Sequence, residues 1–307
     1  MNQEINTIKQ QLNSIILGKP HQIELCLCCL LARGHLLIED LPGMGKTILA
    51  HALANVMGLA FSRIQFTSDL LPADILGVSI FDTGNSSFRF HQGPIFSSVV
   101  LADEVNRASP KTQSALLEAM EERQVSIEGN VYSLPASFFV IATQNSMEQA
   151  GTFPLPESQL DRFFMRIRLG YPDRESERAL LEGEDRRKRL TEMPAAIEEQ
   201  QLLKWQQLVS DVKTSHALLD YIQDLIEQSR NVRRFRVGLS PRAALDIVHG
   251  ARAWALLQGR DYVIPEDVQV VLEPIAGHRL ALASMEEGGI NIGSSAVSNL
   301  IELTPVR

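Results

Sequence analysis

The stretch Glu39-Asp40-Leu41-Pro42-Gly43-Met44-Gly45-Lys46-Thr47 decides the fold of this chain. A short strand-like run, residues 35–38, precedes it, and apolar residues at helical spacing follow it from Ile48 onward. A strand, a glycine-bearing turn and Lys-Thr at a helix start form a cradle for phosphate, because backbone N–H groups and the positive helix N-terminus both attract an anion. The stretch therefore predicts a nucleotide-binding loop.

Each position of this loop has an expected task. Lys46 is placed to reach the outer phosphates of ATP, and the Thr47 hydroxyl is placed to bind Mg²⁺. Asp40 departs from the general pattern, which has glycine six residues before the lysine. The residues predicted to hold the nucleotide here are Pro42, Gly43, Met44, Gly45, Lys46 and Thr47.

Length and composition describe an ordinary globular chain. With 307 residues, 45% hydrophobic and 21% charged, two domains are expected. The net charge of −8 argues against a nucleic-acid binder, which usually carries a basic domain. No apolar run approaches the ~18 residues of a membrane span, and the N-terminus lacks a signal-peptide pattern. These features predict a cytoplasmic protein without a membrane span.

The only cysteines, Cys26, Cys28 and Cys29, lie within a few residues of one another. A metal site or a redox pair is the specific interpretation, but no second cysteine cluster completes such a site. Small apolar residues on a buried helix are the simpler interpretation, since free cysteine is commonly buried.

The order of patterns along the chain predicts the architecture. Up to residue 172 strands and helices alternate, which is typical of a parallel sheet with helices on both faces. Two hairpins interrupt this alternation, at about 77–92 and 124–135, around turns at Thr83-Gly84-Asn85 and Gly129-Asn130. Beyond Pro172 only helical patterns follow. We therefore predict an α/β nucleotide-binding domain, residues 1–172, and an all-α lid domain, residues 173–307.

Two carboxylates and an amide follow the buried strands. Asp103-Glu104 ends the apolar run Val99–Ala102, at the sheet edge where ligands bind in open α/β sheets. One carboxylate can hold Mg²⁺ and the next can deprotonate an attacking water. Asn145 ends a later strand, where it could contact the γ-phosphate or that water.

Together these motifs make the chain resemble the MoxR branch of the AAA+ ATPases, with similarity from Ile16 to about Leu280. The resemblance is carried by the phosphate loop and by the following stretches, quoted by residue number: 69–77 (DLLPADILG), 93–96 (GPIF), 103–108 (DEVNRA), 142–145 (ATQN), 155–157 (LPE) and 160–163 (LDRF). In that family the first hairpin is the helix-2 insertion, and the second precedes the sensor 1 strand.

The resemblance implies roles for individual residues. Lys46 and Thr47 would be Walker A, Asp103 and Glu104 Walker B, and Asn145 sensor 1. Arg162 would be an arginine finger given to a neighbouring subunit, and Arg242 would be sensor 2, acting in its own subunit or in a neighbour's. Ser146 stands where the family usually has proline.

The resemblance also implies a function: an ATP-hydrolysing chaperone that forms a homo-oligomeric ring, expected to be a hexamer. Such proteins remodel or mature a client protein, commonly with a partner that carries a von Willebrand A domain. Alternatives are a dedicated activator of one enzyme or assembly, as in the Rubisco-activating and gas-vesicle relatives, and a nucleic-acid motor. The acidic charge and the absence of basic hairpin tips argue against the motor. Glu104 and Arg162 argue against a scaffold that binds ATP without hydrolysing it.

Overall fold

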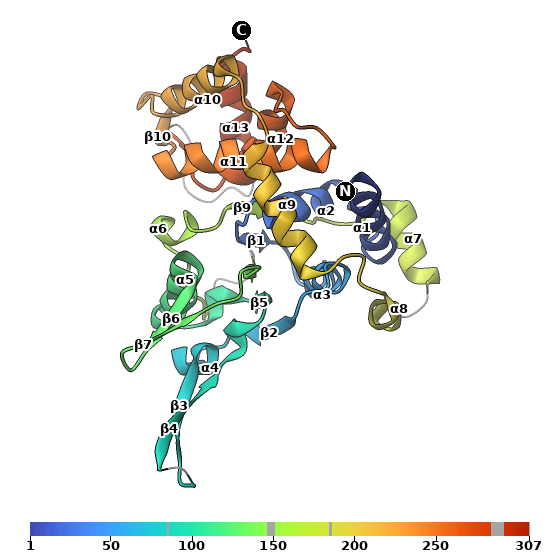
Figure 1. The fold of residues 1–307 in the computed structure, drawn as a ribbon. Coiled ribbons are helices and arrows are strands. Elements are labelled where there is room, and N and C mark those ends of the chain that lie inside the picture. Colours follow the sequence, from blue (N-terminus) through green and yellow to red (C-terminus); the bar gives the residue numbers. More distant parts are fainter. Residues whose placement is uncertain (85, 146–150, 184–185, 284–291, 307) are drawn as a thin grey trace.

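The computed structural model describes residues 1–84, 86–145, 151–183, 186–283 and 292–306 (Figure 1). Its centre is a five-stranded sheet in the order β2-β5-β8-β1-β9, and all neighbouring strands are parallel. The strands are β1 (Leu36–Glu39), β2 (Phe61–Gln65), β5 (Val99–Asp103), β8 (Phe139–Gln144) and β9 (Met165–Ile167). This arrangement confirms the predicted parallel α/β core.

Alternating residues of the strands separate two hydrophobic layers. Leu36 and Ile38 of β1 pack into one buried cluster, with the helices α1 (Asn2–Ile15), α2 (Pro20–Leu31) and α3 (Lys46–Val56). Leu37, between them, packs into the other cluster, with α5 (Pro110–Glu122). Successive strand side chains point to opposite faces, so a strand buried on both sides reads as a continuous apolar run.

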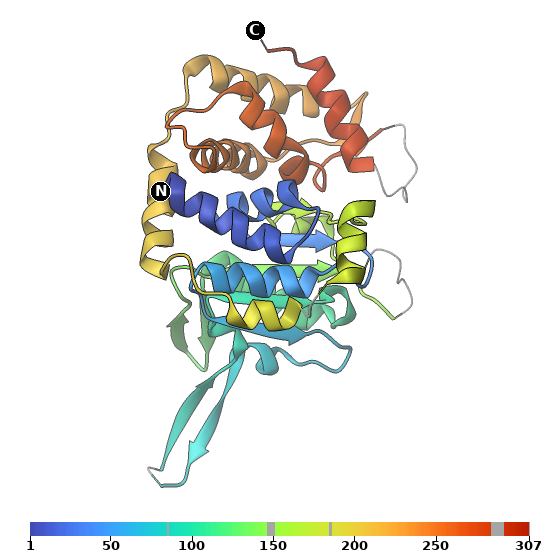
Figure 2. The same ribbon diagram turned by 90° about the vertical axis from the view of Figure 1, so that its right-hand side faces the viewer.

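Both predicted hairpins are present within the predicted bounds. β3 (Gly77–Asp82) pairs with β4 (Ser87–Gln92), and β6 (Gln124–Ile127) pairs with β7 (Asn130–Ser133). The first hairpin extends far beyond the sheet (Figure 2). Of its predicted turn, Asn85 lies outside the described residues.

The turn of the second hairpin lies one residue earlier than predicted. Ile127 pairs with Asn130, so the two central residues are Glu128 and Gly129 rather than Gly129-Asn130. Their φ angles of 51° and 81° are both left-handed, as a type I′ turn requires. The tip of this hairpin therefore carries an acidic residue.

The C-terminal part of the chain is mainly helical and lies beside the edge strand β9 and the helix α2 (Figure 1). A short antiparallel pair, β10 (Phe235–Val237) with β11 (Ala281–Leu282), lies among its helices, and the helical sequence pattern did not predict it. These strands have three and two residues, which is too short to show the alternation of apolar and polar residues typical of a strand. The lid helices are α10 (His216–Ser229), α11 (Pro241–Leu257), α12 (Pro265–Ala276) and α13 (Ile292–Leu303).

The helices directly after residue 172 stay close to the sheet. The Asn55 side chain on α3 donates a hydrogen bond to Leu190 O, and Gln206 donates one to Leu30 O on α2. The division of domains at residue 172 stays a prediction. The helices directly after residue 172 are α7 (Arg174–Glu182), α8 (Arg186–Glu192) and α9 (Glu199–Asp211).

The shorter elements are α4 (Pro72–Leu76), α6 (Glu157–Leu160) and the 3₁₀ turns Pro94–Phe96 and Val105–Arg107. Of the helices in the described ranges, none has the length and apolarity needed to cross a membrane.

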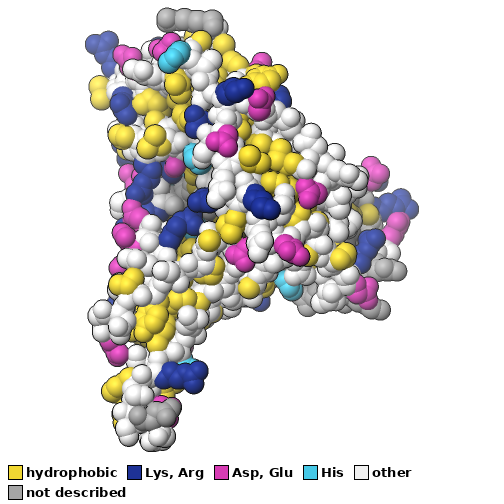
Figure 3. Space-filling view, viewed as in Figure 1, with side chains coloured by type: hydrophobic (Ala, Val, Ile, Leu, Met, Phe, Trp, Pro, Cys, Tyr) yellow, Lys and Arg dark blue, Asp and Glu magenta, His cyan; other side chains and the backbone are white. Residues whose placement is uncertain are grey.

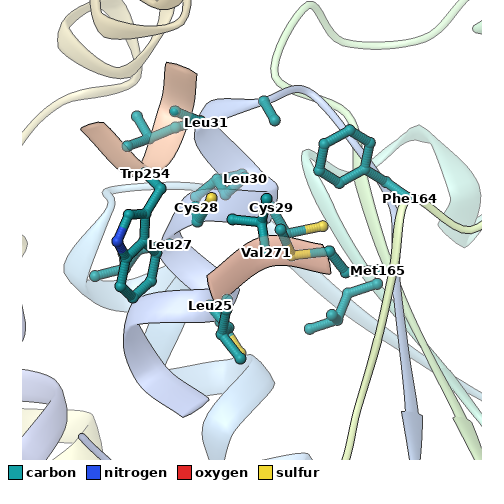
Figure 4. Packing of buried hydrophobic residues seen from close by; sticks show 14 of the residues in the cluster. Leu25, Leu27, Cys28, Cys29, Leu30, Leu31, Phe164, Met165, Trp254 and Val271 are labelled. Carbon is teal, nitrogen blue, oxygen red and sulfur yellow. The ribbon is translucent and has the colours of Figure 1, made fainter. Parts of the chain in front are cut away.

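The three cysteines are buried on α2 as free thiols. Cys28 and Cys29 pack among Trp254, Val271 and Met165, so the lid and the sheet meet at this helix (Figure 4). Burial raises the pKa of the Cys26 thiol to about 12, which makes it a poor nucleophile and a poor metal ligand. These observations support the packing interpretation.

Candidate active site

The phosphate loop between β1 and α3 has an open interior. Gly43 and Gly45 have φ angles of 83° and 85°, a left-handed conformation that glycine adopts without strain. A Cβ atom built at either glycine would meet no described atom within 4 Å, so the space in front of the loop is free. Gly45 is the N-cap of α3, so the positive end of that helix faces this space.

Lys46 is folded back onto the loop. Its Nζ donates hydrogen bonds to the carbonyl oxygens of Asp40, at 2.8 Å, and Gln144, at 3.3 Å. Partial burial lowers the pKa of Lys46, and the nearby carboxylates of Asp40, Asp103 and Glu104 oppose that shift. Both of its partners are neutral carbonyl groups, which an incoming phosphate can replace with a charge-assisted contact.

Asp40, the departure from the general motif, has a structural task. Its buried carboxylate accepts backbone hydrogen bonds from Leu41 at 2.8 Å, Leu169 at 2.7 Å and Gly170 at 2.6 Å. The side chain therefore points away from the open space of the loop. It joins the beginning of the loop to the segment that follows β9.

Asp103 ends β5 and Glu104 follows it, and both contact one partner, Thr143 on β8. The fully buried Thr143 hydroxyl donates to Asp103 Oδ1 at 2.6 Å and accepts from the Glu104 backbone N–H at 2.9 Å. Glu104 has a φ of 58°, which is uncommon for a residue other than glycine. Such strained positions cluster at functional sites.

Two arginines and the amide of Gln65 hold the two carboxylates in place. Arg63 of β2 donates to Asp103 Oδ2, at 2.7 Å from NH2. Arg107 and Gln65 both contact Glu104 Oε2, at 2.9 Å and 3.2 Å. The orientation of Glu104 is therefore fixed by neighbours on β2 and in the turn after β5.

Asn145 is the residue after Gln144, whose backbone contacts the phosphate loop. It directly follows β8 and is buried, and the carbonyl of Gln144 before it accepts from the Asp40 N–H at 3.2 Å and from Lys46. Ser146, the departure from the family pattern, lies outside the described residues. The residues predicted as Walker A, Walker B and sensor 1 thus meet at the C-terminal edge of the sheet.

The structure places Arg162 and Arg242 elsewhere. Both contact Glu121 near the end of α5: Arg162 Nε lies 3.0 Å from Oε2, and Arg242 NH2 lies 2.5 Å from Oε1. They line a hollow of about 340 Å³ with Gly34, His35 and Phe164. These three residues directly precede β1 and β9, so the hollow lies at the N-terminal edge of the sheet.

Arg162 and Arg242 are therefore separated from the phosphate loop by the length of a strand. From His35 to Asp40 a strand rise of ~3.3 Å per residue gives about 17 Å. Basic and acidic side chains gather on this edge of the molecule below the lid (Figure 3). Arg162, the expected arginine finger, is paired with Glu121 within its own chain, and its side chain is about 31% exposed.

The site fits a magnesium ion that arrives with a nucleotide. In the described ranges no group of three or more His, Cys, Asp or Glu side chains could hold a metal without other ligands. Mg²⁺ typically takes one or two protein ligands and completes its shell with water and substrate phosphates. Thr47, in the first turn of α3, and Asp103, at the end of β5, are the side chains suited to this task.

A glycine-lined phosphate loop, two carboxylates after the neighbouring strand and a helical lid define a P-loop ATPase of the AAA class. The family described as "ATPase family associated with various cellular activities (AAA)" matches residues 35–165, and the AAA lid domain matches residues 227–296. The chain belongs to the MoxR-type AAA ATPases.

Relatives align over nearly the whole chain. An uncharacterized protein of Bacillus subtilis, YeaC, is 43% identical over 89% of this chain and 85% of its own length. Chaperone MoxR1 of Mycobacterium tuberculosis is 41% identical over 91% of this chain and 77% of its own length. The crystal structure of a proposed ATPase from Cytophaga hutchinsonii superposes with a TM-score of 0.88 at 35% identity, covering 100% of this chain and 96% of that one.

Several residues that shape the site were not predicted from the sequence. Thr143 and Arg107 stand within stretches that carry the family resemblance, so the motifs held a signal for them. The sequence held no such signal for Arg63, Gln65 and Glu121, because isolated polar residues on a strand or helix are usually surface residues.

Proposed function

We propose that this protein is a ring-forming ATPase in which each active site is built from two subunits. The separation of Lys46 from Arg162 and Arg242 across the sheet carries the proposal. A head-to-tail neighbour would present its N-terminal sheet edge to the phosphate loop, and a rotation that closes such contacts gives a ring. A hexamer is the ring size implied by the family resemblance. Arg242 then acts in the neighbour's site, together with Arg162.

Within one site, the chain's own residues divide the work. Lys46 would exchange its two carbonyl partners for phosphate oxygens, and the loop amides would hold the rest of the phosphate chain. Glu104, oriented by Gln65 and Arg107, would accept the proton of the attacking water. Mg²⁺ bound with ATP would neutralise developing phosphate charge. The neighbour's arginines would stabilise the remaining charge.

The work done with this ATP is proposed to be the remodelling or maturation of a client protein in the cytoplasm. Support comes from the similarity to a protein named chaperone MoxR1. A partner with a von Willebrand A domain is part of the proposal, on the family resemblance alone. Co-purification of the ATP-bound E104Q variant would test it, because a slowly hydrolysing ring should retain its partner.

ATP binding and ATP hydrolysis should separate in two single variants. We expect Lys46→Ala to abolish measurable nucleotide binding, because the cation that meets the outer phosphates is lost. Glu104→Gln should still bind ATP but hydrolyse it about 10²–10⁴-fold more slowly, as expected for loss of a general base. Equilibrium binding of a fluorescent ATP analogue and steady-state ATPase rates measure the two effects. Equal loss of binding in both variants would contradict the role of Glu104.

Arg162→Ala should bind ATP almost normally and hydrolyse it slowly, since related arginine fingers are worth roughly 10³–10⁵ in rate. Mixing it with excess Lys46→Ala subunits should restore activity, because the Lys46→Ala chains still donate Arg162 to intact phosphate loops. Steady-state ATPase of each variant and of the mixture is the measurement, after native mass spectrometry has shown mixed rings. Mixed rings without rescue would remove the argument for a shared site.

A further inference from the structure

Glu121 holds together two cations that come from different parts of the molecule. Arg162 lies just before β9 in the α/β core, whereas Arg242 lies in the first turn of the lid helix α11. The two guanidinium groups meet the two oxygens of one carboxylate, at 3.0 Å and 2.5 Å. Without that carboxylate, two like charges this close would repel each other.

The position of Glu121 is unfavourable for its own helix. It lies in the last turn of α5, where the negative end of the helix dipole disfavours an acidic side chain. The hydrogen bond from Arg242 nevertheless holds the pKa of Glu121 below its ordinary value, and Arg162 adds to that effect. The arginines, rather than the helix, therefore stabilise the charge at this position.

The geometry leaves both arginines able to bind a further anion. Arg162 meets Glu121 through Nε, on one side of its guanidinium, and Arg242 meets it through one terminal nitrogen. A guanidinium carries five N–H donors in a planar fork, so donors remain on each side chain. All three side chains are also partly open to solvent, with exposed fractions of 31%, 45% and 35% for Arg162, Arg242 and Glu121.

We propose that Glu121 is a positioning residue that aligns Arg162 and Arg242 as one unit for the phosphate of the neighbouring subunit. This inference rests on the shared site proposed above. Because one arginine belongs to the core and the other to the lid, Glu121 also fixes the lid to the edge that enters the neighbour's site. The arginines that Glu121 aligns would contact the terminal phosphate of ATP, and Glu121 itself would not contact the substrate.

The test uses Glu121→Gln, with Glu122→Gln as the matched control. Glu122 is the exposed next residue on the same helix and carries the same charge. We expect Glu121→Gln to bind ATP with nearly unchanged affinity and KM, and to lower kcat by about 10²-fold, the cost of misplacing a group by ~1 Å. Glu122→Gln should leave both quantities unchanged.

Subunit mixing separates a role in the neighbour's site from a role in the chain's own site. Excess Lys46→Ala subunits carry an intact Glu121–Arg162–Arg242 cluster, so they should restore activity to Glu121→Gln subunits. Rescue of Arg162→Ala but not of Glu121→Gln would overturn the inference and leave the shared site standing. If neither is rescued, the shared site itself fails.

A double-variant comparison gives a second, independent readout. If Glu121 acts through the arginines, adding Glu121→Gln to Arg162→Ala should lower kcat much less than it does in the intact chain. Fully additive losses would overturn the inference. This comparison does not depend on forming mixed rings, and thermal unfolding of each variant checks that all chains remain folded.

Discussion

Asp40 illustrates how one side chain can replace a motif glycine without blocking the site. Its carboxylate turns away from the phosphate space and binds the Leu169 and Gly170 amides beyond β9. Those residues lie just before Tyr171-Pro172, where the chain leaves the sheet. The phosphate loop and the exit from the sheet are thus held by the same buried group.

We predict that Asp40→Ala lowers both ATP affinity and thermal stability. Each buried N–H left without a partner costs about 1–3 kcal/mol, so a tenfold or larger loss of affinity is expected as the loop loosens. Asp173→Ala is the matched control, because Asp173 also accepts a backbone hydrogen bond, from Ser176, but caps α7. Calorimetric titration with ATP and thermal unfolding measure the effects. Lower stability with unchanged affinity would limit Asp40 to a structural role.

At the scale of elements, the two hairpins support each other. Phe90 on β4 stacks on Tyr132 of β7, with ring centroids 4.2 Å apart and an interplanar angle of 29°. Phe90 also meets Phe96 edge-on at 5.8 Å. An isolated two-stranded hairpin is at best marginally stable in water, so this contact anchors the base of the long arm.

Phe90→Ala should therefore release the long hairpin without affecting nucleotide binding. An aromatic pair contributes about 0.5–1.5 kcal/mol beyond its buried area, so faster amide exchange is expected in β3, β4 and β7. Phe88→Ala is the control, because Phe88 is about 70% exposed and meets Phe81 edge-on nearer the tip. Hydrogen exchange read by mass spectrometry distinguishes the two. Equal exchange in both variants would show that the stacking contributes little.

Elements with a strong local signal could be predicted from the sequence. The phosphate loop, the buried strands and both hairpins follow from glycine positions and apolar periods, which depend on near neighbours. The β10–β11 pair could not be predicted, since it joins short segments far apart in sequence. The turn of the second hairpin lies one residue earlier than predicted, because Glu128 takes the left-handed conformation at its first central position. Asn or Asp is the usual choice at that position.

The sequence predicts which residues of the site lie at the ends of strands, but not the contacts that depend on the lid. Lys46, Asp103, Glu104 and Asn145 converge because the ends of parallel strands share an edge, a consequence of the α/β pattern. The Arg162–Glu121–Arg242 cluster depends on how the lid is placed on the core. No local pattern encodes that placement, so the pairing of both arginines with Glu121 emerged only from the three-dimensional structure.

At the scale of the whole molecule, charge makes a prediction about partners. The net charge is −8, and the second hairpin tip carries Glu128. We expect weak or absent binding of DNA and RNA at physiological salt, in spite of the exposed basic segment at Arg233-Arg234. Fluorescence anisotropy with single-stranded and duplex oligonucleotides over a salt series measures it. Sub-micromolar affinity with a steep salt slope would favour the nucleic-acid motor instead.

The placement of Lys46 and Arg162 at opposite edges of one sheet has a genetic consequence. In the proposed ring every chain would belong to two catalytic centres, giving a phosphate loop to one and arginines to the next. A chain that lacks only Lys46 spoils one centre, whereas a chain that lacks both residues spoils two. In a cell with equal amounts of intact and altered chains, random mixing leaves about one half of the centres working in the first case and about one quarter in the second. The doubly altered allele should therefore be the more dominant one.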